Sequence, residues 1–308
     1  MSTHEPLSRS RWLLFCCLLA GAPSLAADRG YPFTAASFTG VPESGFEFPE
    51  LGSEVQSREY RLVLGLFEFD LGEVGLDLGA DYQYTRYEYV GIEGRNRDLH
   101  RLQVPIGFDY RNRRWQLGGF VAPGVSTSSN IMKDLFDAGS GDDIIVTARL
   151  EGTTQAGEHL HWLAGLAYDR AFGQPAPYPV FGALYGPNET LTFRLAFPDP
   201  AIRYAPSQRQ RLTVRLFPAG HAWHVFSEEL NDDFDYEVEA WRARATWSLG
   251  FKNMIWLDLS AGYAFNRRHE FVDDRGRAIA VNTEDQFFAS IGLRLGDAPI
   301  PYSNEVPR

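Results

Sequence analysis

The feature that most constrains the fold is a long alternation of apolar and polar residues. In "GLDLGADYQYT" (residues 75–85) one parity carries Leu, Leu, Ala, Tyr and Tyr, and the other carries Gly, Asp, Gln and Thr. Successive side chains of a β-strand point to opposite faces, so the pattern predicts a strand with one apolar and one polar face. The pattern recurs along most of the chain, including residues 101–110, 160–169, 191–197, 211–217, 240–251, 256–265 and 286–295.

A soluble β-sandwich also alternates, but three features favour a membrane barrel. The segments have the length of a tilted membrane strand, about 9–11 residues. Their polar face is rich in Gly, Ser, Thr, Gln, Asp and Arg rather than in Lys and Glu, and aromatic residues gather at the segment ends. The sequence therefore predicts an all-β fold, a transmembrane antiparallel up-and-down β-barrel of about 12–14 strands.

The links between segments support this prediction, because short links alternate with long ones. "DLGE" (70–73) and "PAG" (218–220) are short, whereas "FPDPAIRYAPSQ" (197–208) is long. Barrels of the outer membrane have short periplasmic turns and long external loops, and we assign the links in this way. An even strand number needs one more strand before residue 59, and "SFTGVPESGFEF" (37–48) is a poor candidate because Pro42 interrupts it.

The first 26 residues predict a cleaved secretory signal peptide. Arg9 and Arg11 precede an apolar run at 12–20, and small residues stand at Ser24 and Ala26, as a signal peptidase requires. The run is shorter than the roughly 20 residues of a membrane-spanning helix. Both cysteines lie within it, so we expect no disulfide and no thiol-based site in the mature chain.

The expected organisation is a signal peptide (1–26), an N-terminal segment with at most one extra strand (27–57), the barrel (58–296) and a polar periplasmic tail (297–308). We expect an integral protein of the Gram-negative outer membrane, surrounded by its lipids and lipopolysaccharide and inserted by the barrel-assembly machinery. The formal net charge of −11 argues against nucleic acid as a partner. No motif calls for a cofactor.

The stretch from residue 177 to 206, followed by "RLFPAGHAWHV" (215–225), resembles a domain-of-unknown-function family of Gram-negative outer-membrane β-barrels. The matching residues are Pro179, Gly182, Pro187, Phe197-Pro198, Arg203-Tyr204, Gly220 and Trp223. The resemblance extends from about Arg58 to Leu295 as a general residue pattern, and it includes no catalytic signature. It implies architecture and location, and it carries no activity.

Charged residues on the inward parity are the candidate functional residues. They would form a charged constriction that selects solutes by sign and size, or they would pair with one another across a sealed lumen. The predicted pore-lining residues are Arg101, Arg149, Arg211, Arg215, Arg242, Arg244, Arg294, Asp77, Asp81, Asp109, Asp169 and Asp258.

The sequence marks metal binding and hydrolysis less clearly than a charged lumen. His159 and His161 share one face of a strand and are weak metal candidates, because no further ligand motif accompanies them. The function predicted first is a passive channel for small solutes. An outer-membrane hydrolase of lipid or protein is one alternative, although no local motif ties a Ser to a His. A closed structural or adhesive barrel with acidic surface loops is the other.

Overall fold

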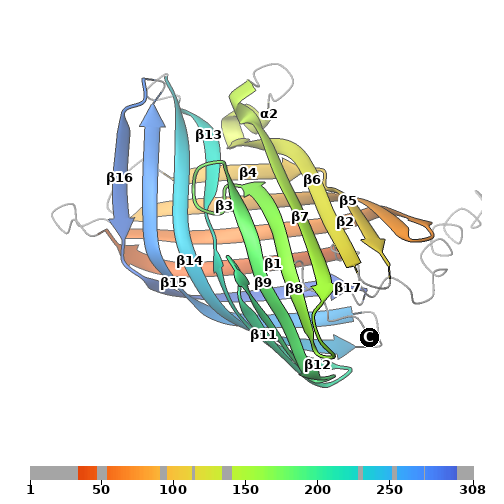
Figure 1. The fold of residues 1–308 in the computed structure, drawn as a ribbon. Helices are drawn as coiled ribbons and strands as arrows, with labels where there is room; N and C mark the ends of the chain where they lie inside the picture. Colours follow the sequence, from red (N-terminus) through yellow and green to blue (C-terminus); the bar gives the residue numbers. More distant parts are fainter. Residues whose placement is uncertain are drawn as a thin grey trace, which may run out of the picture.

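A computed structural model describes residues 34–46, 54–90, 96–112, 115–133, 141–227, 232–251, 255–273 and 275–296. The predicted signal peptide and the predicted tail at 297–308 lie outside these residues. The described chain forms one sheet of 17 strands (Figure 1). No helix in the described part of the chain is long and apolar enough to cross a membrane.

The first strands are β1 (Thr34–Gly45), β2 (Glu54–Leu71), β3 (Val74–Val90), β4 (Arg97–Gln103), β5 (Ile106–Arg111), β6 (Trp115–Ser128), β7 (Ile144–Gln155), β8 (Leu160–Asp169) and β9 (Ala176–Asn188). The others are β10 (Leu191–Phe197), β11 (Ala201–Ser207), β12 (Gln210–Pro218), β13 (His221–Ser227), β14 (Asp232–Phe251), β15 (Ile255–Asp273), β16 (Ala278–Thr283) and β17 (Gln286–Leu295). A short helix α2 (Ser129–Lys133) and a 3-10 turn (Gly141–Asp143) lie between β6 and β7.

The sheet closes into an up-and-down barrel of 14 antiparallel positions, which confirms the predicted fold class and the upper end of the predicted strand number. The 17 strands fill 14 positions because three pairs of consecutive strands are collinear. β4 and β5 both pair with β3 and β6, β12 and β13 both pair with β14, and β16 and β17 both pair with β15. Pairing of β1 with both β2 and β17 closes the ring.

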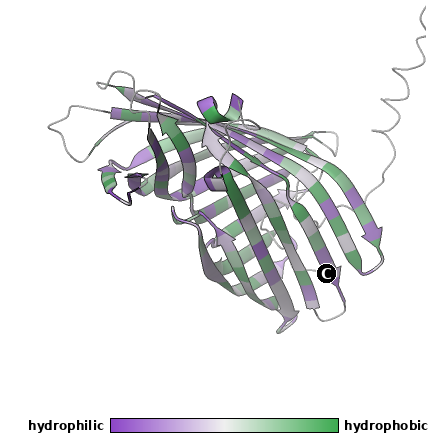
Figure 2. Cartoon of the chain, turned by 90° about the horizontal axis from the view of Figure 1, so that it is seen from above, coloured by the Kyte–Doolittle hydropathy of each residue, from purple (hydrophilic) through white to green (hydrophobic). Residues whose placement is uncertain are grey.

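The alternating pattern is visible as bands of contrasting hydropathy along the strands in Figure 2, and it gives the barrel an apolar outside. Large apolar side chains such as Phe69, Trp162, Phe181 and Phe287 are more than half exposed. Exposed apolar surface of this extent marks contact with lipid or with a partner. We call this outward apolar surface the belt.

The two ends of the barrel differ. Short links join β2 to β3, β9 to β10 and β11 to β12 at one end, the turn end, where β1 begins and β17 ends. The opposite end is the loop end. On β14 and β15 the belt runs from Trp247 to Tyr263, so β13 and the residues of β14 that pair with it extend beyond the belt at the loop end.

Three sequence expectations need correction. The segment that Pro42 interrupts does contribute a barrel strand, β1, which ends at Gly45, and the irregularity is absorbed by a register shift between Val41 and Ser44. The range 197–208 is not a loop, because β11 lies inside it. The "PAG" at 218–220 is no turn but the junction of the collinear strands β12 and β13, since both pair with β14 in the same direction.

The barrel narrows at the loop end because β7 to β11 stop below it. Beyond them β13 reaches β6 directly, and His224 pairs with Thr127 in the single parallel contact among the described strands. We call this contact between β13 and β6 the seam. Two hydroxyls stabilise it, since Ser126 Oγ donates to the carbonyl of Ala222 at 2.7 Å and Thr127 Oγ1 donates to that of His224 at 3.1 Å. The interior at this end is therefore enclosed by fewer strands than at the turn end.

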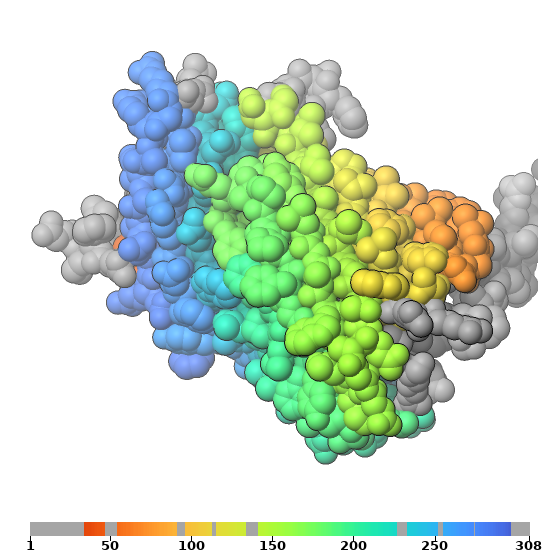
Figure 3. Space-filling view, viewed as in Figure 1, coloured from red at the N-terminus to blue at the C-terminus, as the bar shows by residue number. Residues whose placement is uncertain are grey.

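Residues 170–175 join β8 to β9. They cover the place below this seam where the shorter strands of the wall end. The backbone N–H of Gly220 donates to the carbonyl of Ala171 at 2.8 Å. The ring of Phe172 packs edge-on against Tyr178 and Trp241, with centroids 5.1 and 5.9 Å away. In Figure 3 the green residues of this region form a continuous surface with the neighbouring strands. The wall is thus completed by a connecting segment where strand pairing ends.

Candidate functional site

A polar cavity of about 280 Å³ lies inside the barrel at mid-height. Strands from both sides of the barrel line it, together with the turn at Pro198-Asp199 and the segment 169–171. The strands place charged side chains there because polar residues occupy the inward parity. Residues that are far apart in the sequence thereby meet in one site.

The cavity carries more positive than negative side chains. Among the residues that the structure describes, seven arginines line it against four carboxylates, an excess of three positive charges in a chain whose formal net charge is −11. The arginines are Arg61, Arg101, Arg149, Arg170, Arg215, Arg242 and Arg244, and the carboxylates are Glu59, Asp81, Asp169 and Asp199.

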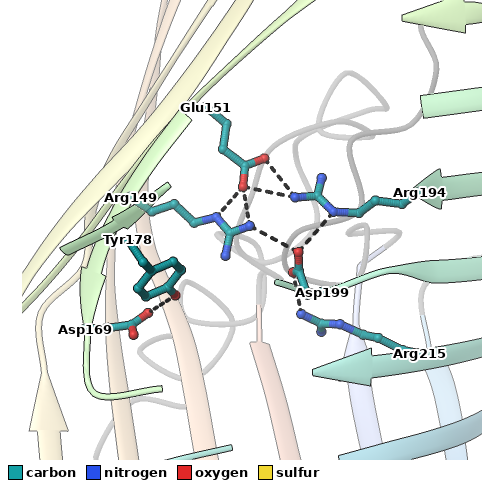
Figure 4. A network of polar contacts seen from close by, with 7 residues as sticks. All are labelled: Arg149, Glu151, Asp169, Tyr178, Arg194, Asp199 and Arg215. Atoms are coloured by element: carbon teal, nitrogen blue, oxygen red, sulfur yellow. Dashed lines mark hydrogen bonds and ion pairs between the residues drawn. The ribbon is translucent and has the colours of Figure 1, made fainter. Parts of the chain in front are cut away.

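One part of the site is a buried network of three arginines and two carboxylates (Figure 4). Asp199 accepts hydrogen bonds from Arg215 at 2.8 Å, Arg194 at 3.3 Å and Arg149 at 3.5 Å. Glu151 accepts both from Arg149 and from Arg194, the latter at 3.1 and 3.2 Å. Arg149 and Arg194 each contact both carboxylates, so each guanidinium is held from two sides and the network keeps its charges in place.

Asp199 reaches this network because the turn between β10 and β11 bends into the lumen. Its side chain is only 3% exposed, and those of Arg194 and Arg149 are 6% and 9% exposed. A carboxylate this deeply buried needs charged partners to offset its lost hydration. Asp169 lies beside the network and accepts a hydrogen bond from Tyr178 Oη at 2.7 Å.

A second group of ion pairs lies across the lumen on β2, β3 and β14. Arg61 donates to both carboxylate oxygens of Asp81 at 2.9 and 2.6 Å. Arg242 donates to Glu59, 183 positions away in the sequence, and one of the two hydrogen bonds measures 3.2 Å. Arg101 donates to Gln83 at 2.6 Å, and one of its guanidinium nitrogens lies 3.2 Å from a ring nitrogen of His221.

Several arginines also lie beside aromatic rings. The guanidiniums of Arg215 and Arg244 lie 4.9 and 5.0 Å from the ring centre of Phe217. Nearer the turn end, Arg211 lies 4.3 Å from the ring centre of Trp256. Stacking leaves the edges of the Arg244 guanidinium available to an anion, whereas Arg215 also donates to Asp199.

A smaller cavity of about 160 Å³ extends toward the turn end. It shares Ser37, Thr39, Arg61 and Arg244 with the larger one, so the two form one polar space. Its floor includes Arg294, whose guanidinium donates to Asp258 at 2.6 and 3.1 Å.

At the loop end the lumen is closed by a buried apolar cluster, which we call the seal. It consists of Val55, Tyr87, Leu99, Trp223, Val225, Tyr236 and Val238. Tyr87 packs edge-on against Trp223 and Tyr236, at ring distances of 6.2 and 5.5 Å. The seal joins the wall of β2 to β4 with the wall of β13 and β14, and the narrowing of the barrel brings these walls together.

The structure places the predicted residues as follows. Arg101, Arg149, Arg215, Arg242, Arg244, Asp81 and Asp169 line the larger cavity, and Arg294 and Asp258 line the smaller one. Arg211, Asp77 and Asp109 line neither. Asp77 instead lies against Gly107 on the neighbouring β5, where a Cβ would come within 2.3 Å of its carboxylate.

Sequence reasoning missed several members of the site. Arg61 and Arg194 stand on the inward parity of their strands, so the alternation rule could have found them. Asp199 could not be found in this way, because it lies in a turn between two prolines. The seal was also missed, because its residues on β13 and β14, at 223–225 and 236–238, lie outside the alternating stretches that the sequence marked.

The described histidines do not gather into a metal site. His161 is buried and His159 is exposed. Within the described ranges, no group of three or more His, Cys, Asp or Glu residues could hold a metal ion.

No protein-family model matches the chain, and no curated relative matches it. Among solved structures, it is similar to an outer membrane channel from Pseudomonas putida F1, with 12% identity over 89% of this chain and 100% of that chain and a TM-score of 0.47.

Two further similar structures are a deletion mutant of the monoaromatic hydrocarbon channel TodX and LpxR from Salmonella typhimurium. TodX has 10% identity over 84% of this chain and 88% of its own, with a TM-score of 0.41. LpxR has 8% identity over 84% of this chain and 99% of its own, with a TM-score of 0.36. With TM-scores below 0.5, these likenesses leave the activity of this chain open.

Proposed function

We propose that the chain is an integral outer-membrane barrel that acts as a passive channel for small solutes, with a preference for anions. The belt supports the membrane location, because a closed barrel leaves no backbone group unpaired in hydrocarbon. In this proposal the outward face contacts membrane lipid and lipopolysaccharide, the assembly machinery inserts the barrel, and residues 1–26 direct export.

The observation that carries the proposal is the excess of three positive charges around the central cavity. A ring of charged side chains in a narrow lumen raises the local concentration of the opposite ion. The ion pairs described above neutralise part of this charge. Arg244, which stacks on Phe217, then supplies remaining attraction for an anion that enters from the turn end.

Passage through the barrel requires the seal to open. The polar space reaches from mid-barrel toward the turn end, whereas apolar side chains fill the lumen at the loop end. Movement of β13 away from β2 to β4 would connect the cavity to the loop end. We therefore expect brief openings rather than a permanently open pore.

The proposal is tested by planar-bilayer recording of the refolded protein under a salt gradient. The wild type should show discrete current steps with a reversal potential on the anion side. One charge at 4 Å in water contributes about 1 kcal/mol, so Arg244→Gln should lower the anion preference by about fivefold. Arg275→Gln, which removes an exposed arginine after β15, is the matched control and should change little.

Absence of steps in the wild type would contradict the channel and favour the closed structural barrel. Cation preference in the wild type would contradict the assigned role of the arginines.

A further inference from the structure

A second constellation of reactive side chains lies on the outside of the barrel, away from the lumen. It stands where β3, β4 and the start of α2 meet. Its members are Tyr82, His100 and Ser129, and all three are half-buried. None of the three lines either lumen cavity.

The three side chains form one hydrogen-bonded chain. His100 Nε2 lies 2.7 Å from Ser129 Oγ, and His100 Nδ1 lies 2.8 Å from Tyr82 Oη. With the imidazole proton on Nδ1, Tyr82 accepts it and Nε2 is left to accept the hydroxyl proton of Ser129. Ser129 Oγ is also 3.3 Å from the carbonyl of Asp98, a longer contact. This is the arrangement of nucleophile, base and orienting group that acyl transfer requires.

The strand register shows that these groups face outward. His100 shares its parity with Leu102 and Val104, which are 38% and 42% exposed. The neighbours of His100 have the opposite parity and face inward, since Leu99 belongs to the seal and Arg101 lines the larger cavity. Ser129 can therefore meet only a substrate outside the barrel.

The height of this group matches the edge of the belt. A row of outward aromatic rings runs from Phe38 to Tyr60, Tyr84 and His100, with successive ring distances of 4.9, 5.9 and 5.2 Å. Aromatic girdles of this kind lie at the boundary between acyl chains and headgroups. Ester bonds of membrane lipids lie at the same depth.

We propose that Ser129, His100 and Tyr82 form a hydrolytic site for the acyl esters of amphiphiles in the outer leaflet. The placement in the membrane rests on the proposed outer-membrane location, but the site does not depend on an open channel. Ser129 is the nucleophile, His100 is the general base, and Tyr82 is a positioning residue.

The reaction consumes one ester and one water. Ser129 Oγ attacks the acyl carbonyl carbon while its proton passes to His100 Nε2. The bond from this carbon to the alkoxy oxygen then breaks, and the proton on Nε2 completes the leaving alcohol. Water attacks the acyl group on Ser129, its proton returns through Nε2 to Ser129 Oγ, and the fatty acid leaves.

Charged side chains above the site indicate an anionic headgroup. Arg58 and Arg86 lie on the outward parity with side chains 47% and 38% exposed. Both contact Glu88, and Arg86 also lies 3.8 Å from Asp98. Partly exposed guanidiniums bind phosphate readily. Phospholipid and lipopolysaccharide both combine such a phosphate with acyl esters.

The test is the release of fatty acid by the refolded full chain, measured by mass spectrometry. One arm uses phosphatidylglycerol vesicles and the other uses purified lipopolysaccharide. Release in either arm identifies the source of the ester. We expect Ser129→Ala and His100→Gln each to lower the rate at least about 100-fold, the usual contribution of a general base or nucleophile. Ser128→Ala, an inward-facing neighbour, should retain the wild-type rate.

Tyr82→Phe removes only the hydroxyl and tests the positioning role. It should lower kcat and shift the pH–rate profile while KM stays unchanged. A fluorophosphonate probe should label the wild type on Ser129 and leave Ser129→Ala unlabelled.

Heat-modifiable gel mobility verifies that each variant is folded. Absence of release in both arms with folded wild type would overturn the site, as would wild-type rates in Ser129→Ala. Bilayer conductance is recorded on the same samples, so failure of the hydrolytic site and failure of the channel are distinguishable.

Discussion

Asp199→Asn should be among the most destabilising substitutions of the lumen, because the Asp199 carboxylate accepts hydrogen bonds from three guanidiniums. Their nitrogens lie 2.8, 3.3 and 3.5 Å from its oxygens. At an effective dielectric constant of about 20, a contact of 4 Å is worth about 4 kcal/mol before hydration is counted. Much of this gain is offset by the loss of hydration. Removing one partner of a buried ion pair costs a net 3–5 kcal/mol or so.

The measurement is urea unfolding of the barrel in lipid vesicles, followed by tryptophan fluorescence. We expect the free energy of unfolding to fall by about 3–5 kcal/mol in Asp199→Asn. Glu158→Gln, which removes an exposed carboxylate just before β8, should change it little. In the double variant Asp199→Asn/Arg215→Gln one unpaired guanidinium is gone, so part of the loss should be recovered. A loss below about 1 kcal/mol in Asp199→Asn, the range of a surface pair, would refute the assignment of Asp199 as the hub of the network.

The remaining predictions concern the loop end and strand contact. Trp223→Ala should enlarge the lumen at the seal, lengthen channel openings and lower the free energy of unfolding by about 3–5 kcal/mol; unchanged gating and stability would count against the seal. His224 lies beyond the belt, and its hydrogen bond to Asp235 raises its pKa. The protonated imidazole therefore stabilises the fold fully below about pH 6.5, and this stabilisation is lost as the pH rises through the higher folded-state pKa. Channel openings should become more frequent from pH 6 to pH 8 in the wild type and not in His224→Gln. A Cβ on Gly124 would lie 2.1 Å from a backbone oxygen of β4, so Gly124→Ala should cost about 1–3 kcal/mol in urea unfolding, whereas Gly141→Ala, with open space around it, should cost nothing measurable.

Much of the barrel could be predicted because its signal is local. Every second residue of "GLDLGADYQYT" faces the same side, so the inward and outward sets follow from parity without knowledge of any neighbour. The same rule identified Arg242 and Arg294 as inward-facing. It failed for residues 198–207 and 218–220, where prolines hide β11 and disguise the junction of β12 and β13.

The partners of the charged residues could not be predicted. Parity shows that Glu59 and Arg242 face inward, but their pairing across 183 positions depends on strand order and register around the whole barrel. The contact of Ser129 with His100 likewise forms only because β6 pairs with β4 and α2 begins where β6 ends.

The sequence by itself determined the class of fold, the apolar outside and the polar inside, because these depend on the two-residue period of a strand. Only the tertiary structure decided that the lumen is closed at the loop end, which arginines share a carboxylate, and that a serine and a histidine meet on the outer face. The physical reason is that these features arise between strands distant in the chain, where closure of the barrel and the meeting of β13 with β6 set the distances.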